Sequence, residues 1–181
     1  MTTEIAAAPQ IIAAQTEPLW FLGTLARVKL DGQQTAGRFA LIELLAPRGA
    51  APPLHSHPQD ETFYVLDGEV TAWIVEPELL PNDQDDPPAW VTQCAQRCGP
   101  GTVVFAPGGT PHTFRVESDT ARTLILSTPA GIEDFMRALG APAQWPWLPP
   151  PPDGPRVPAE RMETVGREQA VVNHGPPPPP S

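Results

Sequence analysis

The stretch GAAPPLHSHPQDETFYVLDG, residues 49–68, contains two of the four histidines of this chain. His55 and His57 are two positions apart, so in an extended strand their imidazoles point to the same side. Glu61 follows four residues later. A second stretch, GTVVFAPGGTPH (residues 101–112), ends in His112. Together these side chains would form a pocket of three imidazoles and one carboxylate for a divalent metal ion.

Each of these residues also has a simpler explanation. A His-x-His pair can be hydrogen-bonded in a turn, and Glu61 can be a surface carboxylate at the start of a strand. Two observations favour ligands. Pro58 disfavours a helical conformation at His57. Glu61 shares its strand parity with Phe63 and Val65, which favour the interior, and a buried carboxylate is costly unless it binds a cation.

The spacing of both stretches resembles the two sequence motifs of the cupins. The first motif has glycine, two histidines, glutamate and glycine, and the second has glycine, proline, glycine and histidine; here they are Gly49, His55, His57, Glu61, Gly68 and Gly101, Pro107, Gly109, His112. The flanking segments 20–23, 128–131 and 139–140 look like those of quercetin dioxygenase-like bacterial monocupins. The resemblance implies an all-β fold, a double-stranded β-helix or jelly-roll barrel.

The resemblance also implies a function. His55, His57, Glu61 and His112 would hold one divalent transition metal (Fe, Mn, Ni, Co, Cu or Zn), and dioxygen would be inserted into a flavonol, phenol or enol bound through its hydroxyl. Glu61 would also be the catalytic base, with its proton affinity raised by an apolar pocket. One position departs from the second motif, because Val116 stands where that motif usually has Asn.

Two other functions use the same site. A metal-dependent isomerase, lyase or decarboxylase would use the ion as a Lewis acid without consuming oxygen, and a non-catalytic cupin would bind a small ligand without turnover. We expect an enzyme, because open metal positions in an apolar pocket suit catalysis. The expected lining is apolar: Phe39 or Ile42, Phe63, Val65, Phe105, Phe114 and Val116. Trp20, Trp73 and Trp90 belong either to the pocket mouth or, as we favour, to the core.

Composition restricts the partners. The 181 residues include 11 Lys and Arg against 21 Asp and Glu, for a net charge of −10. This balance argues against nucleic acid and anionic membranes. No apolar run is long enough for a membrane span, and Met1–Gln10 lacks the basic start of a signal peptide, so we expect a cytoplasmic protein. Cys94 and Cys98 are then expected to be free thiols at a strand edge rather than half of a zinc site.

The remaining expectations concern the elements. Strands are predicted at 19–30 (interrupted at Gly23), 37–46, 61–67, 69–76, 102–106, 112–117 and 121–128, with 61–67 and 69–76 joined by a tight antiparallel turn at Gly68. A helix over 132–139 should cap the barrel, and a short one is predicted within 158–169. The acidic segment 77–88, with Asp83, Asp85 and Asp86, is expected to be a solvated loop rather than a calcium site.

These elements give a division of the chain into a flexible arm (1–17), a cupin domain (18–140), a Pro-rich extension with a short helix packed on the barrel (141–175) and a solvent-exposed polyproline tail (176–181). The expected partners are a small-molecule substrate and O2. We also expect a homodimer, formed through an edge strand within Leu19–Leu30.

Overall fold

The computed structural model describes residues 7–13, 16–80, 90–148 and 157–179. Asp83, Asp85 and Asp86 lie outside the described residues, as do most of the 77–88 loop and parts of the N-terminal arm and the polyproline tail. The division of the chain into an arm, a domain, an extension and a tail stays a prediction. Within the described residues, no helix is both long and apolar enough to cross a membrane.

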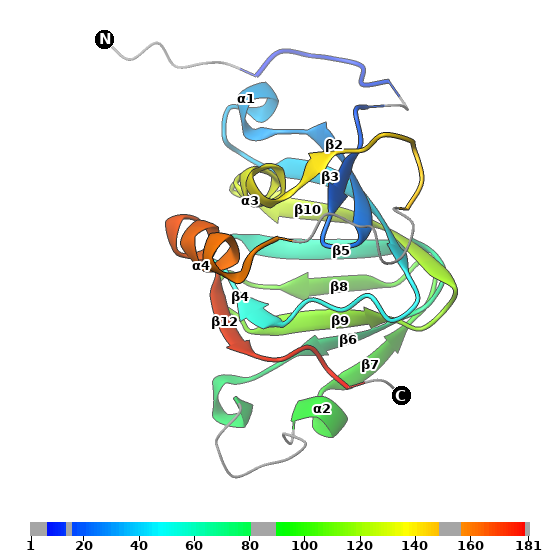
Figure 1. Ribbon diagram of the computed structural model, residues 1–181, viewed down its shortest axis with the longest axis vertical. Coiled ribbons are helices and arrows are strands. Elements are labelled where there is room, and N and C mark those ends of the chain that lie inside the picture. The colour runs from blue at the N-terminus through cyan, green and yellow to red at the C-terminus, as the bar shows by residue number, and fades with distance from the viewer. Residues whose placement is uncertain (1–6, 14–15, 81–89, 149–156, 180–181) are drawn as a thin grey trace.

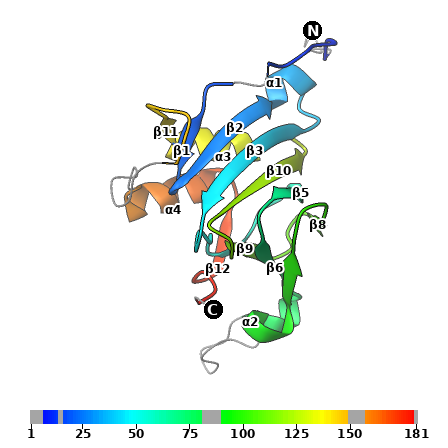
Figure 2. The same ribbon diagram turned by 90° about the vertical axis from the view of Figure 1, so that its right-hand side faces the viewer.

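Two antiparallel sheets face one another, which confirms the all-β jelly-roll prediction (Figures 1 and 2). The seven-stranded sheet has the order β11 (Ala141–Pro142), β1 (Leu19–Phe21), β2 (Thr24–Leu30), β3 (Ala40–Pro47), β10 (Thr120–Thr128), β5 (Asp60–Asp67) and β8 (Val103–Ala106). The five-stranded sheet has the order β12 (Val172–Gly175), β4 (Leu54–Ser56), β9 (His112–Val116), β6 (Val70–Ile74) and β7 (Ala95–Cys98).

The core between the sheets follows from alternation along the strands. In β3 every second residue, starting at Ala40, is buried, and the predicted interior residues Ile42, Phe63, Val65 and Val116 belong to one apolar cluster. The expectation for Phe105 is wrong. Its side chain is 53% exposed, because β8 turns Val104 and Ala106 inward and therefore turns Phe105 outward.

The turn at Gly68 is a corner between the sheets rather than the predicted hairpin. β5 pairs with β10 and β8, whereas β6 pairs with β9 and β7, so the chain changes sheet at this glycine. Gly68 has φ +81°, and a Cβ there would lie 2.3 Å from the carbonyl oxygen of Thr120. Only glycine combines this backbone conformation with so close a contact.

Helix α3 (Ile132–Leu139) has the predicted bounds and buries its apolar stripe: Ile132, Met136 and Leu139 are buried, and Phe135 packs edge-on against Phe21. Its Glu133 is 2% exposed and accepts hydrogen bonds from the backbone N–H groups of Gly131 and Gly32. Gly32 begins the one-turn helix α1 (Gly32–Thr35), so this carboxylate joins α1 to α3. Helix α4 (Ala159–Glu168) confirms the second predicted helix and packs beside α3.

A second apolar cluster lies outside the barrel. Leu54, Trp73, Val75 and Trp90 are buried together, against partly buried residues from the segment that includes α2 (Trp90–Gln93). Trp73 and Trp90 are therefore core residues, as we favoured, and Trp20 is likewise buried. Cys94 and Cys98 are free, and Cys98 lies in the edge strand β7, as predicted.

Two expectations about the periphery are corrected. Residues 19–30 form no sheet edge, because β1 lies between β11 and β2, and β2 lies between β1 and β3. The homodimer itself stays a prediction. The polyproline segment is not simply solvent-exposed: Pro178 is buried, and the Arg115 guanidinium donates a hydrogen bond to the carbonyl of Pro179.

Candidate metal centre

Three histidines converge between the two sheets at the end where β4 and β9 pair. His55 on β4 lies directly opposite His112 on β9, and their ring centroids are 4.6 Å apart. His57 follows β4 and lies 5.0 Å from His112, centroid to centroid. One ligand nitrogen from each ring lies within 4.8 Å of the other two. Two nitrogens bound to one ion at about 2.1 Å are separated by about 3 to 4 Å, so little closure is needed.

Backbone carbonyls fix the orientation of all three rings. The Nδ1 atoms of His55, His57 and His112 lie 2.8, 3.1 and 2.8 Å from the carbonyl oxygens of Pro53, Gln59 and Thr110. A carbonyl only accepts, so each Nδ1 carries the proton and each Nε2 of a neutral ring carries a lone pair. Metal-bound histidines are commonly held in this way.

Glu61, at the start of β5, brings a carboxylate from the other sheet. Its Oε2 lies 3.2 Å from the Nε2 of His57 and its Oε1 lies 3.9 Å from the Nε2 of His112. Its side chain is 13% exposed, which agrees with the inward orientation predicted from strand parity. Glu61 borders the three-histidine cluster and is not part of the set of mutually close ligand atoms.

The electrostatics keep His55 neutral and Glu61 anionic. Burial, and then the neighbouring His112, lower the pKa of His55 to about 4. Burial alone would raise the pKa of Glu61, but the hydrogen bond with His57 and the charges of the imidazoles outweigh it and lower the pKa to about 2. The expectation that an apolar pocket raises the proton affinity of Glu61 is therefore wrong, because the imidazoles stabilise the carboxylate more than burial destabilises it.

Hydrogen bonds join the loop that follows His57 to the loop that precedes His112. The backbone N–H of Gly109 donates to the carbonyl of His57 at 2.7 Å, and that of Gly108 donates to Oδ1 of Asp60 at 2.7 Å. A Cβ on Gly108 would lie 2.2 Å from the Pro58 carbonyl oxygen, so glycine is required for this close approach. The loop before His112 is thereby fixed against the loop after His57.

One histidine that lies beside the site was not singled out in the sequence. The fourth histidine, His174 on β12, lies outside the cluster, and its Nε2 is 2.8 Å from Oγ of Ser56, the residue between His55 and His57. β12 pairs with β4 along this stretch. A lone His near a Pro-rich terminus gave no signal of this, because the pairing depends on contacts more than a hundred residues apart.

The cluster fits a transition-metal ion. Nε2 of His112 is buried and has no hydrogen-bond partner among the described residues, which would be costly in a site built only for structure. Nε2 of His57 lies 3.2 Å from Oε2 of Glu61, so that a single ion could contact both atoms. Imidazole nitrogens with a neighbouring carboxylate suit ions from manganese to zinc.

Comparisons with known proteins agree with the fold and the motifs. A family model described as a cupin domain matches residues 41–84, which include His55, His57 and Glu61. Quercetin 2,3-dioxygenase of Bacillus subtilis (strain 168) is 28% identical over 119 residues, covering 65% of this chain and 30% of that protein. The chain therefore spans about 30% of the length of this curated relative.

The comparison with solved structures gives two further matches. Oxalate decarboxylase of Bacillus subtilis superposes with a TM-score of 0.53 at 18% identity, covering 71% of this chain and 32% of that chain. A polyketide cyclase from Streptomyces resistomycificus has a TM-score of 0.44 at 25% identity, covering 71% and 80% of the two chains. With its two motifs and its paired sheets, this chain is a cupin-domain protein with distant similarity to quercetin 2,3-dioxygenase and other bacterial cupins.

Proposed function

We propose that this protein is a metal-dependent dioxygenase that acts on a small phenol, flavonol or enol. One observation carries the proposal: three imidazoles, each with Nδ1 fixed by a backbone carbonyl, direct their Nε2 atoms toward one point beside the Glu61 carboxylate. His55, His57 and His112 would hold the ion, with Glu61 as the fourth ligand. A bound transition-metal ion would supply Lewis acidity and the redox chemistry of dioxygen.

Glu61 limits the class of substrate. Its carboxylate is ionised at neutral pH, because the hydrogen bond with His57 and the neighbouring imidazoles outweigh burial and lower its pKa. It can take a proton readily only from a hydroxyl that is itself acidic. Enols and phenols meet this condition better than aliphatic alcohols. Glu61 would accept that proton and hold it close to the bound substrate.

The apolar character of the barrel interior agrees with such a substrate. Phe63 and Phe114, whose ring centroids are 5.9 Å apart, belong to the apolar cluster that fills the barrel with Val116. An apolar interior excludes water and favours a flat aromatic or enolic molecule over a charged one. The similarity to quercetin 2,3-dioxygenase supports the same class of reaction.

The first test is the metal content per chain, measured by elemental analysis after purification without added metal. We expect close to one transition-metal ion in the wild type and none in His57→Ala. The control is His174→Gln, which alters the histidine outside the cluster and should retain the metal. A wild type that is empty and refuses reconstitution would overturn the proposal.

The second test separates dioxygenation from the other functions of a metal cupin. Oxygen consumption is followed with an electrode while the loaded protein is supplied with flavonols, catechols and acyclic enols. Oxygen uptake in step with substrate loss supports the proposal. Substrate loss without oxygen uptake would identify an isomerase, lyase or decarboxylase, and tight binding without turnover would identify a binding protein.

A further inference from the structure

The chain after β12 cannot continue the sheet in which it starts. β12 pairs with β4 from Val172 to Gly175, and five consecutive prolines follow at 176–180. Proline has no backbone N–H, so the ladder stops at Gly175, while every proline carbonyl remains an acceptor. Such a run adopts the extended polyproline II helix, which has no internal hydrogen bonds. Any fixed position of this segment must come from donors and apolar surfaces elsewhere.

The outer face of the five-stranded sheet supplies both hydrogen-bond donors and apolar surface. Figure 1 shows the C-terminal segment running past β9 and β6 toward β7. A cavity of about 290 Å³ lies on this face, lined by Thr71, Trp73, Val91, Ala95, Arg97, Arg115 and Pro179. Along β9, His112 points inward to the metal centre whereas Arg115 points outward to this cavity. The cavity is therefore separate from the histidine cluster.

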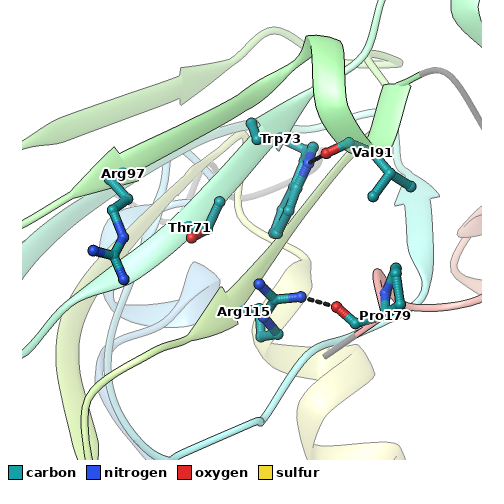
Figure 3. A pocket seen from close by; sticks show the side chains of 7 residues that line it. Thr71, Trp73, Val91, Arg97, Arg115 and Pro179 are labelled. Carbon is teal, nitrogen blue, oxygen red and sulfur yellow. Dashed lines mark hydrogen bonds between the residues drawn. The ribbon is translucent and has the colours of Figure 1, made fainter. Parts of the chain in front are cut away.

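Arg115 is held in place before it meets the prolines. Its Nε and Nη2 atoms donate to Oε1 of Glu117 at 3.0 and 2.8 Å, and the same oxygen accepts from the hydroxyl of Thr71 at 2.7 Å. The guanidinium carbon lies 5.4 Å from the ring centroid of Trp73. This arrangement leaves Nη1 to donate to the Pro179 carbonyl, as Figure 3 shows.

Trp73 is fixed as firmly as Arg115. Its side chain is 2% exposed, and its indole N–H donates to the Val91 carbonyl at 2.9 Å (Figure 3). Pro178, next to the bonded Pro179, is buried. Proteins recognise polyproline II segments in aromatic-lined grooves. Here a side-chain donor, Nη1 of Arg115, also meets a proline carbonyl.

We propose that the outer face of β6, β7 and β9 is a docking groove for polyproline II segments, and that the chain's own residues 176–179 occupy it. The ligand class is a short proline-rich peptide, recognised through Trp73 and through the Nη1 donor of Arg115. A polyproline segment is stiff before it binds, so docking costs little conformational entropy. The tether through β12 raises its local concentration to the millimolar range.

The test uses the full-length chain and a variant in which Pro177, Pro178 and Pro179 are each replaced by glycine, which removes the polyproline conformation of the tethered segment. A fluorescent peptide GPPPPPS is titrated with each protein and its anisotropy is measured. We expect saturable binding to the variant and binding at least about tenfold weaker to the wild type, whose own segment competes. The peptide GAAAAAS is the control ligand and should bind neither protein.

Two further substitutions locate the site. Added to the glycine variant, Arg115→Ala should weaken peptide binding at least about tenfold, whereas Arg122→Ala, at an exposed arginine of the seven-stranded sheet, should not. The groove is refuted if the glycine variant binds GPPPPPS no better than GAAAAAS, or if Arg115→Ala and Arg122→Ala behave alike.

A separate readout reports folding and occupancy together. In a 15N-labelled sample, the indole N–H signal of Trp73, assigned with Trp73→Phe, should move in the glycine variant and return when the peptide is added. The signal of Trp20, in the other sheet, should stay in place and so show that the variant is folded. Pro178→Gly alone provides a milder form of the variant, and an unmoved Trp73 signal in both variants would also overturn the proposal.

Discussion

Glu61 is the one carboxylate beside the three histidines among the described residues. Its Oε2 lies 3.2 Å from Nε2 of His57. Glu61→Gln replaces one oxygen by an amide that can donate to His57, so the fold should survive while the negative charge is lost. We predict that metal affinity falls about 100-fold or more, measured by competition with a chelator.

The control for this substitution is Asp119→Asn, which removes a carboxylate that is 96% exposed and pairs only at the surface with Arg48. It should leave metal affinity within about twofold of the wild type. Equal metal affinity in Glu61→Gln and the wild type would contradict the proposal that Glu61 is a ligand. The three histidines would then be the whole of the protein's contribution.

Asp31 gives a prediction about pH. It caps α1 through the N–H of Gln34, and its Oδ2 lies 2.8 Å from Nη2 of Arg137. Burial raises the pKa of Asp31, but the Arg137 hydrogen bond and the capping N–H groups outweigh it, so the pKa falls below its ordinary value of 3.8. The unfolded chain therefore binds this proton more readily. The stabilisation is complete above the ordinary value and is lost as pH falls through the folded-state value.

Asp31→Asn keeps a good N-cap and removes the charge. We predict a loss of about 0.5–1 kcal/mol in the free energy of unfolding at pH 7, measured with urea, since Arg137 is partly exposed. The difference from the wild type should shrink as the pH is lowered below about 4. Asp134→Asn, at a carboxylate that is 63% exposed and 3.5 Å from Arg137, should change stability less at every pH.

Among the elements, the Pro107–Thr110 turn determines whether His112 reaches the other histidines. Gly108→Ala places a Cβ 2.2 Å from the Pro58 carbonyl oxygen, so the turn must move away from the loop that follows His57. We predict a loss of about 1–3 kcal/mol in stability, together with weaker metal binding. Gly99→Ala is the matched control, because a Cβ there has nothing within 4 Å. Chemical denaturation and metal titration of both variants check this prediction.

The sequence predicted the elements whose pattern is local. Alternating burial along β3 and β10 and the helical spacing of α3 depend only on neighbouring residues, so their positions agree closely with the structure. The three histidines were predicted to lie together because their spacing resembles the two cupin motifs. The short strand β12 was missed, since four residues carry no measurable period.

The errors arose where the outcome depends on distant contacts. At Gly68 the local pattern of two strands around a glycine fits a hairpin and a corner equally well, and only the pairing of β5 with β10 distinguishes them. Phe105 was expected inside on hydrophobicity, but the register of β8 against β5 turns it outward. The lowered pKa of Glu61 likewise depends on the positions of His57 and His112, which the sequence does not fix.

At the scale of the whole molecule, the proposed ligands come from both sheets. His55 and His112 lie on β4 and β9 of the five-stranded sheet, whereas Glu61 lies on β5 of the seven-stranded sheet. Unfolding separates them, so an ion that binds only the folded state stabilises the whole protein. With free metal at 100 times its dissociation constant, this stabilisation is about 2.7 kcal/mol. For a chain of this size, that corresponds to a rise of about 5–10 °C in Tm.

The measurement is calorimetry of the chelator-treated protein with and without added metal. His57→Ala is the control and should melt at the same temperature in both conditions, because it lacks one of the three clustered imidazoles. His174→Gln should show the full rise, since its histidine lies outside the cluster on β12. A wild type whose Tm rises no more than that of His57→Ala would mean that the folded cluster binds no ion, and would contradict the proposed metal site.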